Sequence, residues 1–145
     1  MTTETDSTSR QNWELAKARF LILASLVSAD EHDGPLGQAN LDASEALDDL
    51  GYKPSAETRA AFAAASDAEQ AALLHHMETV YSPARAAAQA LFEALAPDAD
   101  AVAYKAEMLE SRWEVCGHTG EPDAFAVISA DAQRLLEGHS RPAGA

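Results

Sequence analysis

This sequence contains few cysteines, few aromatic residues and few basic residues. Cysteine occurs once, as Cys116, so no disulfide can form within the 145-residue chain. Aromatic residues make up 6%, whereas β-sheets are enriched in aromatic and β-branched side chains. Lysine and arginine number ten against 24 acids, which gives a net charge of -14. The composition therefore favours helices in a chain without disulfides and with an acidic surface.

The shortage of basic residues argues against direct nucleic-acid binding, because contacts to phosphates require a basic surface. It is compatible with an acidic protein that docks on a basic partner, and equally with a surface that serves solubility alone. A single cysteine fits the reducing cytoplasm, where we expect the protein to reside. No phosphate-binding loop, dinucleotide fingerprint or nucleophile elbow occurs, so we expect no cofactor.

The longest apolar run, "FLILASLV" at residues 20–27, is shorter than the roughly 20 residues that span a bilayer, so we expect no membrane segment. Lys17 and Arg19 precede this run and "VSA" follows it. A secreted protein cleaved after Ala29 is therefore an alternative. Acids in the N-terminal segment and a helical stripe of large side chains favour a structural helix instead.

Apolar spacing predicts an all-α fold, a single-domain bundle of about six to seven mostly antiparallel helices. We expect a disordered tail at 1–11, a helical domain at 12–138 and a flexible tail at 139–145. Capping serines at 55, 66 and 82 are typical of helix starts. The expected helices are 12–30, 37–50, 56–65, 66–81, 82–96, 99–116 and 122–138.

The first helix is expected to be central and covered on two sides. Trp13, Phe20 and Val27 lie on one apolar face, and a second face is formed by Leu15, Ile22 and Leu26. Similar spacing predicts the inward-facing residues of three later helices. These are Leu73, Leu74, Met77, Val80 and Tyr81; Val102, Ala106, Leu109, Trp113 and Cys116; and Phe125, Ile128, Ala132, Leu135 and Leu136.

An acidic corner, "ADEHDG", follows the first helix. Asp30, Glu31, His32 and Asp33 are candidate ligands for a hard cation, although their spacing is not that of an EF-hand. The simpler explanation is a solvated turn, because Asp-Gly-Pro is common in turns. The order of apolar helix, "ADEHDG" and acidic second helix resembles the tellurite-resistance TerB-like helical domains, although no second acidic motif follows.

Three residues are candidate acid–base groups. Glu31 shares the stripe of Trp13, Phe20 and Val27, and a carboxylate at the edge of a core has a raised pKa. His76 is expected at the boundary of its helix, and His118 lies in a glycine-flanked loop. A ligand pocket is predicted separately around four side chains: Tyr81, Tyr104, Trp113 and Cys116.

These features favour an accessory or regulatory cytosolic protein that binds a protein partner or a small apolar molecule. The first alternative is a small cofactor-independent enzyme of a specialised biosynthetic pathway, using Glu31, His76 and His118. The second alternative is a metal-binding helical module built on the acidic corner. No complete catalytic motif decides whether the protein is an enzyme.

Overall fold

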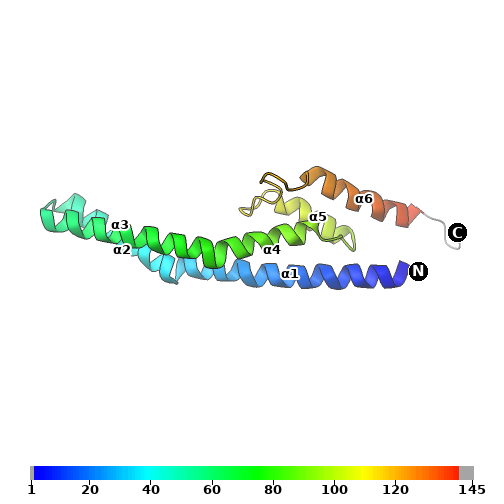
Figure 1. The fold of residues 1–145 in the computed structure, drawn as a ribbon, viewed down its shortest axis with the longest axis horizontal. Helices are drawn as coiled ribbons and strands as arrows, with labels where there is room; N and C mark the ends of the chain where they lie inside the picture. The colour runs from blue at the N-terminus through cyan, green and yellow to red at the C-terminus, as the bar shows by residue number, and fades with distance from the viewer. Residues whose placement is uncertain (1, 141–145) are drawn as a thin grey trace. The chain divides into compact units, whose positions relative to one another are not determined.

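The computed structural model describes the backbone of residues 2–140 and the side chains of residues 7–138. Over this range every regular element is a helix, which confirms the all-α prediction. Met1 and residues 141–145, parts of the two expected tails, lie outside the described residues. The elements are α1 (Thr2–His32), α2 (Pro35–Tyr52), α3 (Ala56–His76), the π-helical turn η1 (Met77–Tyr81), α4 (Ser82–Glu93), α5 (Ala99–Met108) and α6 (Ala124–Ser140) (Figure 1).

Contacts group the residues into two compact units. The hairpin unit is Ile22–Ala84, and the aromatic unit comprises the chain up to Leu21 and from Arg85 onward. Two helices, α1 and α4, each contribute residues to both units. Within residues 2–140, no helix combines the length and the apolarity that a bilayer span requires.

The hairpin unit is built on the antiparallel pair α2 and α3, which lie side by side (Figure 1). The residues that face the partner helix recur three and four apart, and most of them are small. They are Leu36, Ala39, Ala43, Ala46 and Leu50 on α2, and Thr58, Phe62, Ala65, Glu69, Ala72 and His76 on α3, all buried or half-buried. Because alanine dominates this seam, several leucines of both helices lie outside it.

The start of α3 is the one predicted at Ser55. The Ser55 hydroxyl accepts a hydrogen bond from the Thr58 N–H at 3.1 Å, and the Thr58 hydroxyl accepts one from the Ser55 N–H at 2.8 Å. The start predicted at Ser66 is wrong, because α3 continues through it to His76. The fourth α-helix does begin at Ser82, but it continues directly from the π-helical turn and has no free N-terminus there.

The π-helical turn explains why Pro83 does not end this long helix. The Ser82 N–H donates to the Met77 carbonyl, five residues back. Proline has no N–H, and its ring crowds the carbonyl four residues before it. A wider turn directly before Pro83 relieves this crowding, as π-turns within helices do.

The N-terminal segment is also helical rather than a tail, because α1 begins at Thr2 and not near residue 12. Ser9 is 9% exposed, and Arg10 donates to the Asp98 carboxylate at 2.8 Å. These contacts lie within the aromatic unit and fix the polar start of α1. The predicted cleavage site at Ala29 lies inside the same helix.

Edge-to-face aromatic pairs fix α1 in the aromatic unit. The ring centroids of Trp13 and Tyr104 lie 5.9 Å apart, and those of Phe20 and Trp113 lie 5.6 Å apart. Such pairs add about 0.5 to 1.5 kcal/mol beyond the area they bury. The α1 face predicted to lie in the core is therefore confirmed.

The helix predicted at 99–116 is shorter and is rotated relative to the prediction. It ends at Met108, and its buried residues are Ala101, Lys105 and Met108 rather than Val102, Ala106 and Leu109. The prediction failed because a lysine occupies a core position, which hides the true apolar stripe. Beyond Met108 the chain continues through turns to α6, which itself runs past Gly138, its predicted end.

Lys105 is fully buried and forms an ion pair with Asp131 on α6. The Lys105 Nζ lies 2.5 Å from Asp131 Oδ2 and also donates to the Ala94 carbonyl. The other oxygen, Asp131 Oδ1, accepts hydrogen bonds from the Ala96 N–H and from Arg134. Burial lowers the pKa of Lys105, although the hydrogen bond that Lys105 donates to Asp131 opposes this shift. One carboxylate thus joins α5, α6 and the segment that follows α4.

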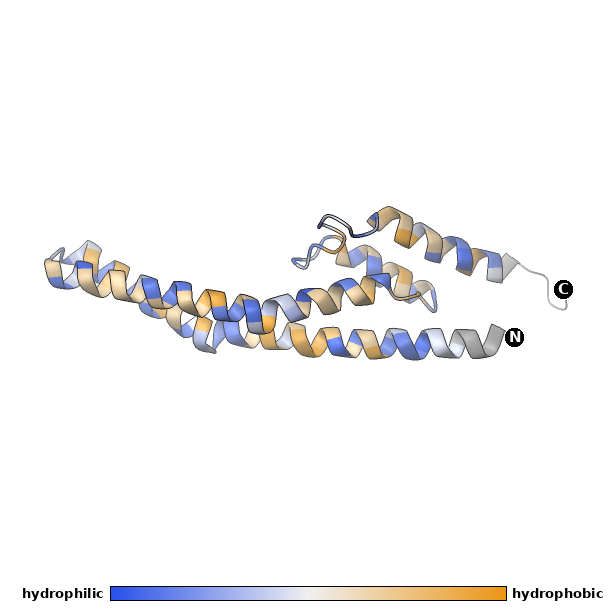
Figure 2. Ribbon diagram, viewed as in Figure 1, coloured by the Kyte–Doolittle hydropathy of each residue, from blue (hydrophilic) through white to orange (hydrophobic). Residues whose placement is uncertain are grey.

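Several other helix faces that were predicted to lie inside the fold are exposed. Figure 2 shows that the middle of α1 is hydrophobic, and part of this stretch is exposed as well. The second face of α1 is open to solvent, so the prediction of a helix covered on two sides is wrong. The exposed residues are Leu15, Ile22 and Leu26 on α1, Leu73 and Leu74 on α3, Met77 in η1, and Phe125 and Leu136 on α6.

Replacing Asp131 with alanine is expected to lower the free energy of unfolding by about 3 to 5 kcal/mol, because Lys105 would be buried without a counter-charge. Urea denaturation measures this change. The combination of Lys105→Met and Asp131→Leu should recover much of the loss. Asp67→Ala, on the exposed side of α3, is the control and should change stability by less than about 0.5 kcal/mol. A loss in Asp131→Ala no larger than in Asp67→Ala would contradict this role.

Candidate functional site

The corner between α1 and α2 depends on Asp30. A carboxylate near the C-terminus of α1 meets the negative end of that helix dipole, which is unfavourable. The side chain, however, serves the next helix, because Asp30 Oδ1 accepts the Leu36 N–H at 3.2 Å. Gly34, at the N-cap position of α2, supplies no side-chain cap. Asp30 therefore caps α2 from the preceding helix.

The second oxygen of Asp30 joins α1 to α3. Asp30 Oδ2 lies 2.7 Å from His76 Nδ1, and His76 is 2% exposed. Burial pushes the pKa of Asp30 upward, but the hydrogen bonds to His76 and to the Leu36 N–H outweigh it and hold the pKa below its ordinary value. His76 was predicted at the helix boundary, and the structure places it in the interior of the hairpin unit.

Two glycines make this corner possible through close backbone approach. A Cβ on Gly34 would lie 2.5 Å from Asp30 Oδ1 and 2.7 Å from the Asp30 Cα. A Cβ on Gly37 would lie 2.5 Å from the His32 carbonyl oxygen. The segment "DGPLG" is thus required by the turn geometry, which supports the structural interpretation of the acidic corner.

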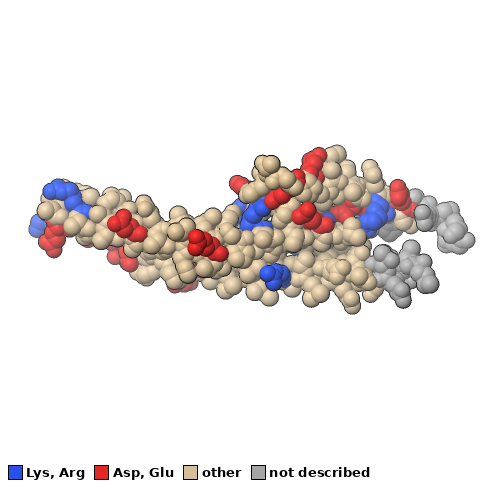
Figure 3. Space-filling view, viewed as in Figure 1, with Lys and Arg blue, Asp and Glu red and all other residues tan. Residues whose placement is uncertain are grey.

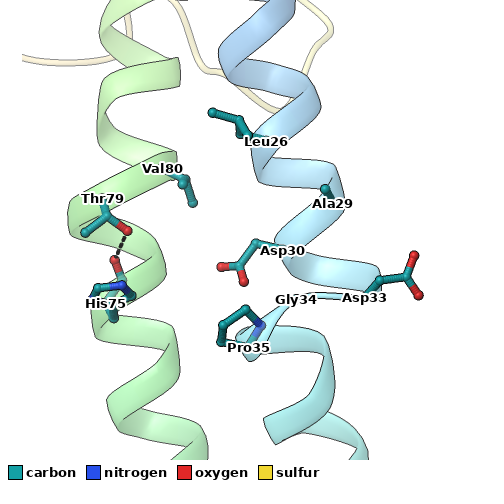
Figure 4. A pocket seen from close by; sticks show the side chains of 9 residues that line it. All are labelled: Leu26, Ala29, Asp30, Asp33, Gly34, Pro35, His75, Thr79 and Val80. Atoms are coloured by element: carbon teal, nitrogen blue, oxygen red, sulfur yellow. Dashed lines mark hydrogen bonds between the residues drawn. The ribbon is translucent and has the colours of Figure 1, made fainter.

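A hollow of about 430 Å³, open to solvent, lies beside Asp30 within the hairpin unit. In Figure 4 the Asp30 carboxylate points toward α3, whereas Asp33 points away from it. Thr79 donates to the His75 carbonyl at 2.7 Å on the opposite wall. The lining residues are Leu26, Ala29, Asp30, Asp33, Gly34, Pro35, His75, Thr79 and Val80.

The predicted metal ligands do not converge. Asp30 bonds to His76 and Leu36, and the His32 Nδ1 lies 2.7 Å from the Ser28 carbonyl oxygen. Asp33 is exposed and Glu31 is half-buried. Among the side chains that the structure describes, no group of three or more His, Cys, Asp or Glu is arranged to hold a metal ion.

The three predicted acid–base residues belong to different surroundings. Glu31 and His76 lie in the hairpin unit, where His76 is buried against Asp30 and is not among the residues that line the hollow. His118 belongs to the aromatic unit, is exposed, and has its Nδ1 3.2 Å from Arg85. The structure therefore gives His76 and His118 separate, local contacts.

Arg85 and Gln89, one turn apart on α4, hold the segment that follows α5. Arg85 donates to the carbonyls of Trp113 and Glu114, at 3.3 and 2.8 Å. Gln89 Oε1 accepts the Cys116 N–H at 2.7 Å, and its Nε2 donates to the Cys116 sulfur at 3.4 Å. Glu114 and Cys116 have φ of 50° and 59°, which costs non-glycine residues energy and requires such contacts.

Glu121 completes this network. It accepts two hydrogen bonds from Arg85, at 2.6 and 3.0 Å, and one from the His118 N–H at 3.2 Å. The hydrogen bond from Arg85 is the main cause that lowers the pKa of Glu121 to about 2. The loop is therefore tied down at any physiological pH, and its strained backbone has a structural cause.

The predicted ligand pocket does not form as one site. Tyr104 packs on Trp13, Trp113 packs on Phe20, and Cys116 contacts Gln89. Tyr81, in the hairpin unit, lies with its ring centroid 6.4 Å from that of His76. Neither the hollow beside Asp30 nor a second hollow at Ser28 and His32 includes any of these four predicted residues.

The sequence interpretation missed four residues that organise the fold. Arg85 and Gln89 carried one available signal, since polar side chains four apart on an alanine-rich helix indicate a shared polar contact. Lys105 and Asp131 gave no such signal, because each interrupts an apolar stripe and the two residues lie 26 positions apart in the sequence.

Replacing Asp30 with asparagine is expected to lower the free energy of unfolding by about 1 to 3 kcal/mol at pH 7. The folded-state pKa of Asp30 is below its ordinary 3.8, so its stabilisation is present above that pH and is lost as pH falls through the lowered value. The stability difference between wild type and Asp30→Asn should therefore shrink below about pH 4. Asp33→Asn is the matched control, and a pH-independent difference for Asp30→Asn would refute the assignment.

Replacing Arg85 with methionine should free the loop and speed labelling of Cys116 by a disulfide reagent several-fold. The reason is that local opening, which exposes a half-buried thiol, becomes easier when Arg85 no longer binds the loop carbonyls and Glu121. Thiol-labelling kinetics measure this effect. Arg59→Met, on α3, provides the control. Equal rates in both variants would show that Arg85 does not restrain the loop.

The chain was compared with family models, curated proteins and solved structures. No family model, curated protein or solved structure matches it.

Proposed function

We propose that the protein is an interaction module whose hairpin unit binds a basic protein partner. The observation that carries this proposal is the outer face of α2, opposite the seam with α3. Leu41, Glu45, Asp48 and Tyr52 recur there at i, i+4, i+7 and i+11 and form one exposed line, called here the α2 strip. Leu41 is 52% exposed and Tyr52 is 92% exposed.

The charge of the hairpin unit is strongly one-sided. Between Ile22 and Ala84 the chain has eleven of its 24 acids but only two of its ten bases, Lys53 and Arg59. In Figure 3 the basic side chains of this hairpin gather at its tip, and the visible charges along its length are acidic. Asp42 and Asp49 flank the α2 strip, so a partner that covers it meets mainly negative charge, with Lys53 next to Tyr52 at the tip.

Apolar and acidic groups on one strip define the kind of partner that fits. Burial of Leu41 and Tyr52 supplies affinity, at roughly 25 cal/mol per Å² of apolar surface. The surrounding carboxylates attract a positive surface, raise the association rate and disfavour acidic competitors. A helix or loop that presents apolar residues between lysines and arginines satisfies both requirements.

The small apolar ligand of the main sequence prediction and the enzyme alternative receive less support. A small apolar ligand needs an enclosing pocket, whereas the hollow beside Asp30 is open to solvent. An acid–base reaction needs its histidine within reach of a substrate, and His76 does not line that hollow. We therefore assign Asp30 and His76 a structural role.

Site-specific photo-crosslinking in the source cells tests this proposal. With Leu41→p-benzoylphenylalanine, we expect a crosslinked product whose partner, identified by mass spectrometry, carries a basic surface. Leu136→p-benzoylphenylalanine on α6, a residue 67% exposed, is the matched control. Exposed charges are screened beyond about 8 Å at physiological ionic strength, so added salt before irradiation of a lysate should reduce the product.

Charge substitutions distinguish specific docking on the α2 strip from nonspecific association. Glu45→Gln with Asp48→Asn should reduce the crosslink at position 41 several-fold. Glu107→Gln with Glu110→Gln removes the same charge from exposed positions of the aromatic unit and should leave the crosslink unchanged. A product that is equal at positions 41 and 136, or insensitive to Glu45 and Asp48, would rule out docking on the α2 strip.

A further inference from the structure

A second exposed surface, on α1, has the pattern of a helix–helix seam. Five residues recur there three and four apart, and all of them are exposed on one unbroken helix: Leu15, Ala18, Ile22, Ser25 and Ala29. Leu15 is 70% exposed and Ile22 is 63% exposed. This line, called here the α1 strip, lies opposite the buried face of Trp13, Phe20 and Val27. Its spacing is that of the a and d positions of a heptad repeat.

The residues that flank the α1 strip complement one another. With Leu15 and Ile22 at a positions, Glu14 and Leu21 occupy g positions, and Arg19 and Leu26 occupy e positions. In a parallel pair of helices, each g residue faces the e residue five positions later on the partner. Glu14 of one copy would then face Arg19 of the other, and Leu21 would face Leu26. Leu21 and Leu26 are 48% and 49% exposed.

The flanking charges are available for such pairing. Both Glu14 and Arg19 are exposed, and no ion pair involves either of them among the side chains that the structure describes. We propose that the α1 strip is a self-association surface, through which two copies of the chain form a parallel dimer. This inference is independent of the α2 strip and of any basic partner.

The net charge of -14 does not prevent this association. Residues 7–29 contain three bases and one acid, so the strip lies in the one part of α1 that is not acidic. Charges elsewhere on the two copies are screened beyond about 8 Å, whereas the pair of Glu14 and Arg19 would be in contact. The seam covers only two heptads, so the dimer is expected to be weak and to depend on concentration.

An antiparallel pair does not satisfy the same groups. In that arrangement e residues face e residues and g residues face g residues, so Glu14 no longer meets Arg19. Leu21 no longer faces Leu26 either, so all four flanking contacts of the parallel dimer are lost. The e and g positions set orientation in coiled coils, and here they favour the parallel one.

Sedimentation or light scattering over a concentration series tests whether the dimer exists. The mass should rise toward twice 15.4 kDa as concentration increases. Ile22→Ser should abolish the rise, and Leu136→Ser, at an equally exposed position on α6, should preserve it. A wild type that stays monomeric at high concentration, or a dimer that Ile22→Ser does not weaken, would overturn the proposal.

Charge exchange tests the facing pair directly. Glu14→Lys alone and Arg19→Glu alone should each weaken the dimer, because each places like charges opposite one another. The double variant should restore it. Mixing the two single variants should give a heterodimer that is tighter than either homodimer. If the single variants associate as strongly as wild type and the mixture shows no preference, Glu14 and Arg19 do not face each other.

A cysteine on the strip tests the orientation. In a Cys116→Ser background, Ala18→Cys places a thiol at a d position, where a parallel dimer brings the two copies of residue 18 together. Oxidation should then link the two chains in high yield. Ala86→Cys, exposed on α4, should link only poorly. A dimer that is stable but does not link through residue 18 would exclude the parallel arrangement.

Discussion

The Asp30 carboxylate is the contact on which the hairpin unit depends. It caps α2 through the Leu36 N–H and binds His76 on α3, so one side chain connects three helices. The alanine-rich seam between α2 and α3 buries little surface per residue, and close packing alone therefore fixes the pair weakly. Gly34 permits the close approach to Asp30, and Gly37 permits the approach to the last carbonyls of α1. The acidity of the corner thus has a structural origin at Asp30, while Glu31 is half-buried and Asp33 is exposed.

The aromatic unit uses the same device, again with an aspartate that binds several partners. There Lys105 is the buried charge, and Asp131 distributes its two oxygens among α5, α6 and the chain after α4. Arg85 likewise ties down a loop whose backbone is strained at Glu114 and Cys116. In both units a single charged side chain with several partners replaces apolar contacts that alanine cannot supply. This explains why a chain with few aromatic residues still holds a defined arrangement within each unit.

Sequence reasoning identified the helical class, the buried face of α1 and the cap at Ser55, because these follow from local spacing and local hydrogen bonds. It failed where a distant partner reverses a local preference. Lys105 was not among the residues predicted to face inward, and only Asp131, 26 residues later, makes its burial tolerable. Ser82 and Pro83 were expected to start a helix, and a π-turn carries the helix through them. Only part of the candidate site could be predicted. The position of Asp30 after the apolar helix made it a candidate, whereas its partner His76 was expected at the boundary between the buried and exposed faces of its helix.

The exposed leucines also follow from the use of alanine where helices pack together. A seam of alanines brings two helices close together and leaves the larger residues on the outer faces, where they can contact another molecule. On α2 those residues lie among acids, which favours a basic partner, and on α1 they lie between opposite charges five residues apart, which favours a second copy. The two surfaces differ in the charges around their leucines rather than in the leucines themselves. Charge pattern, not apolar area, therefore separates the partner that each surface can bind.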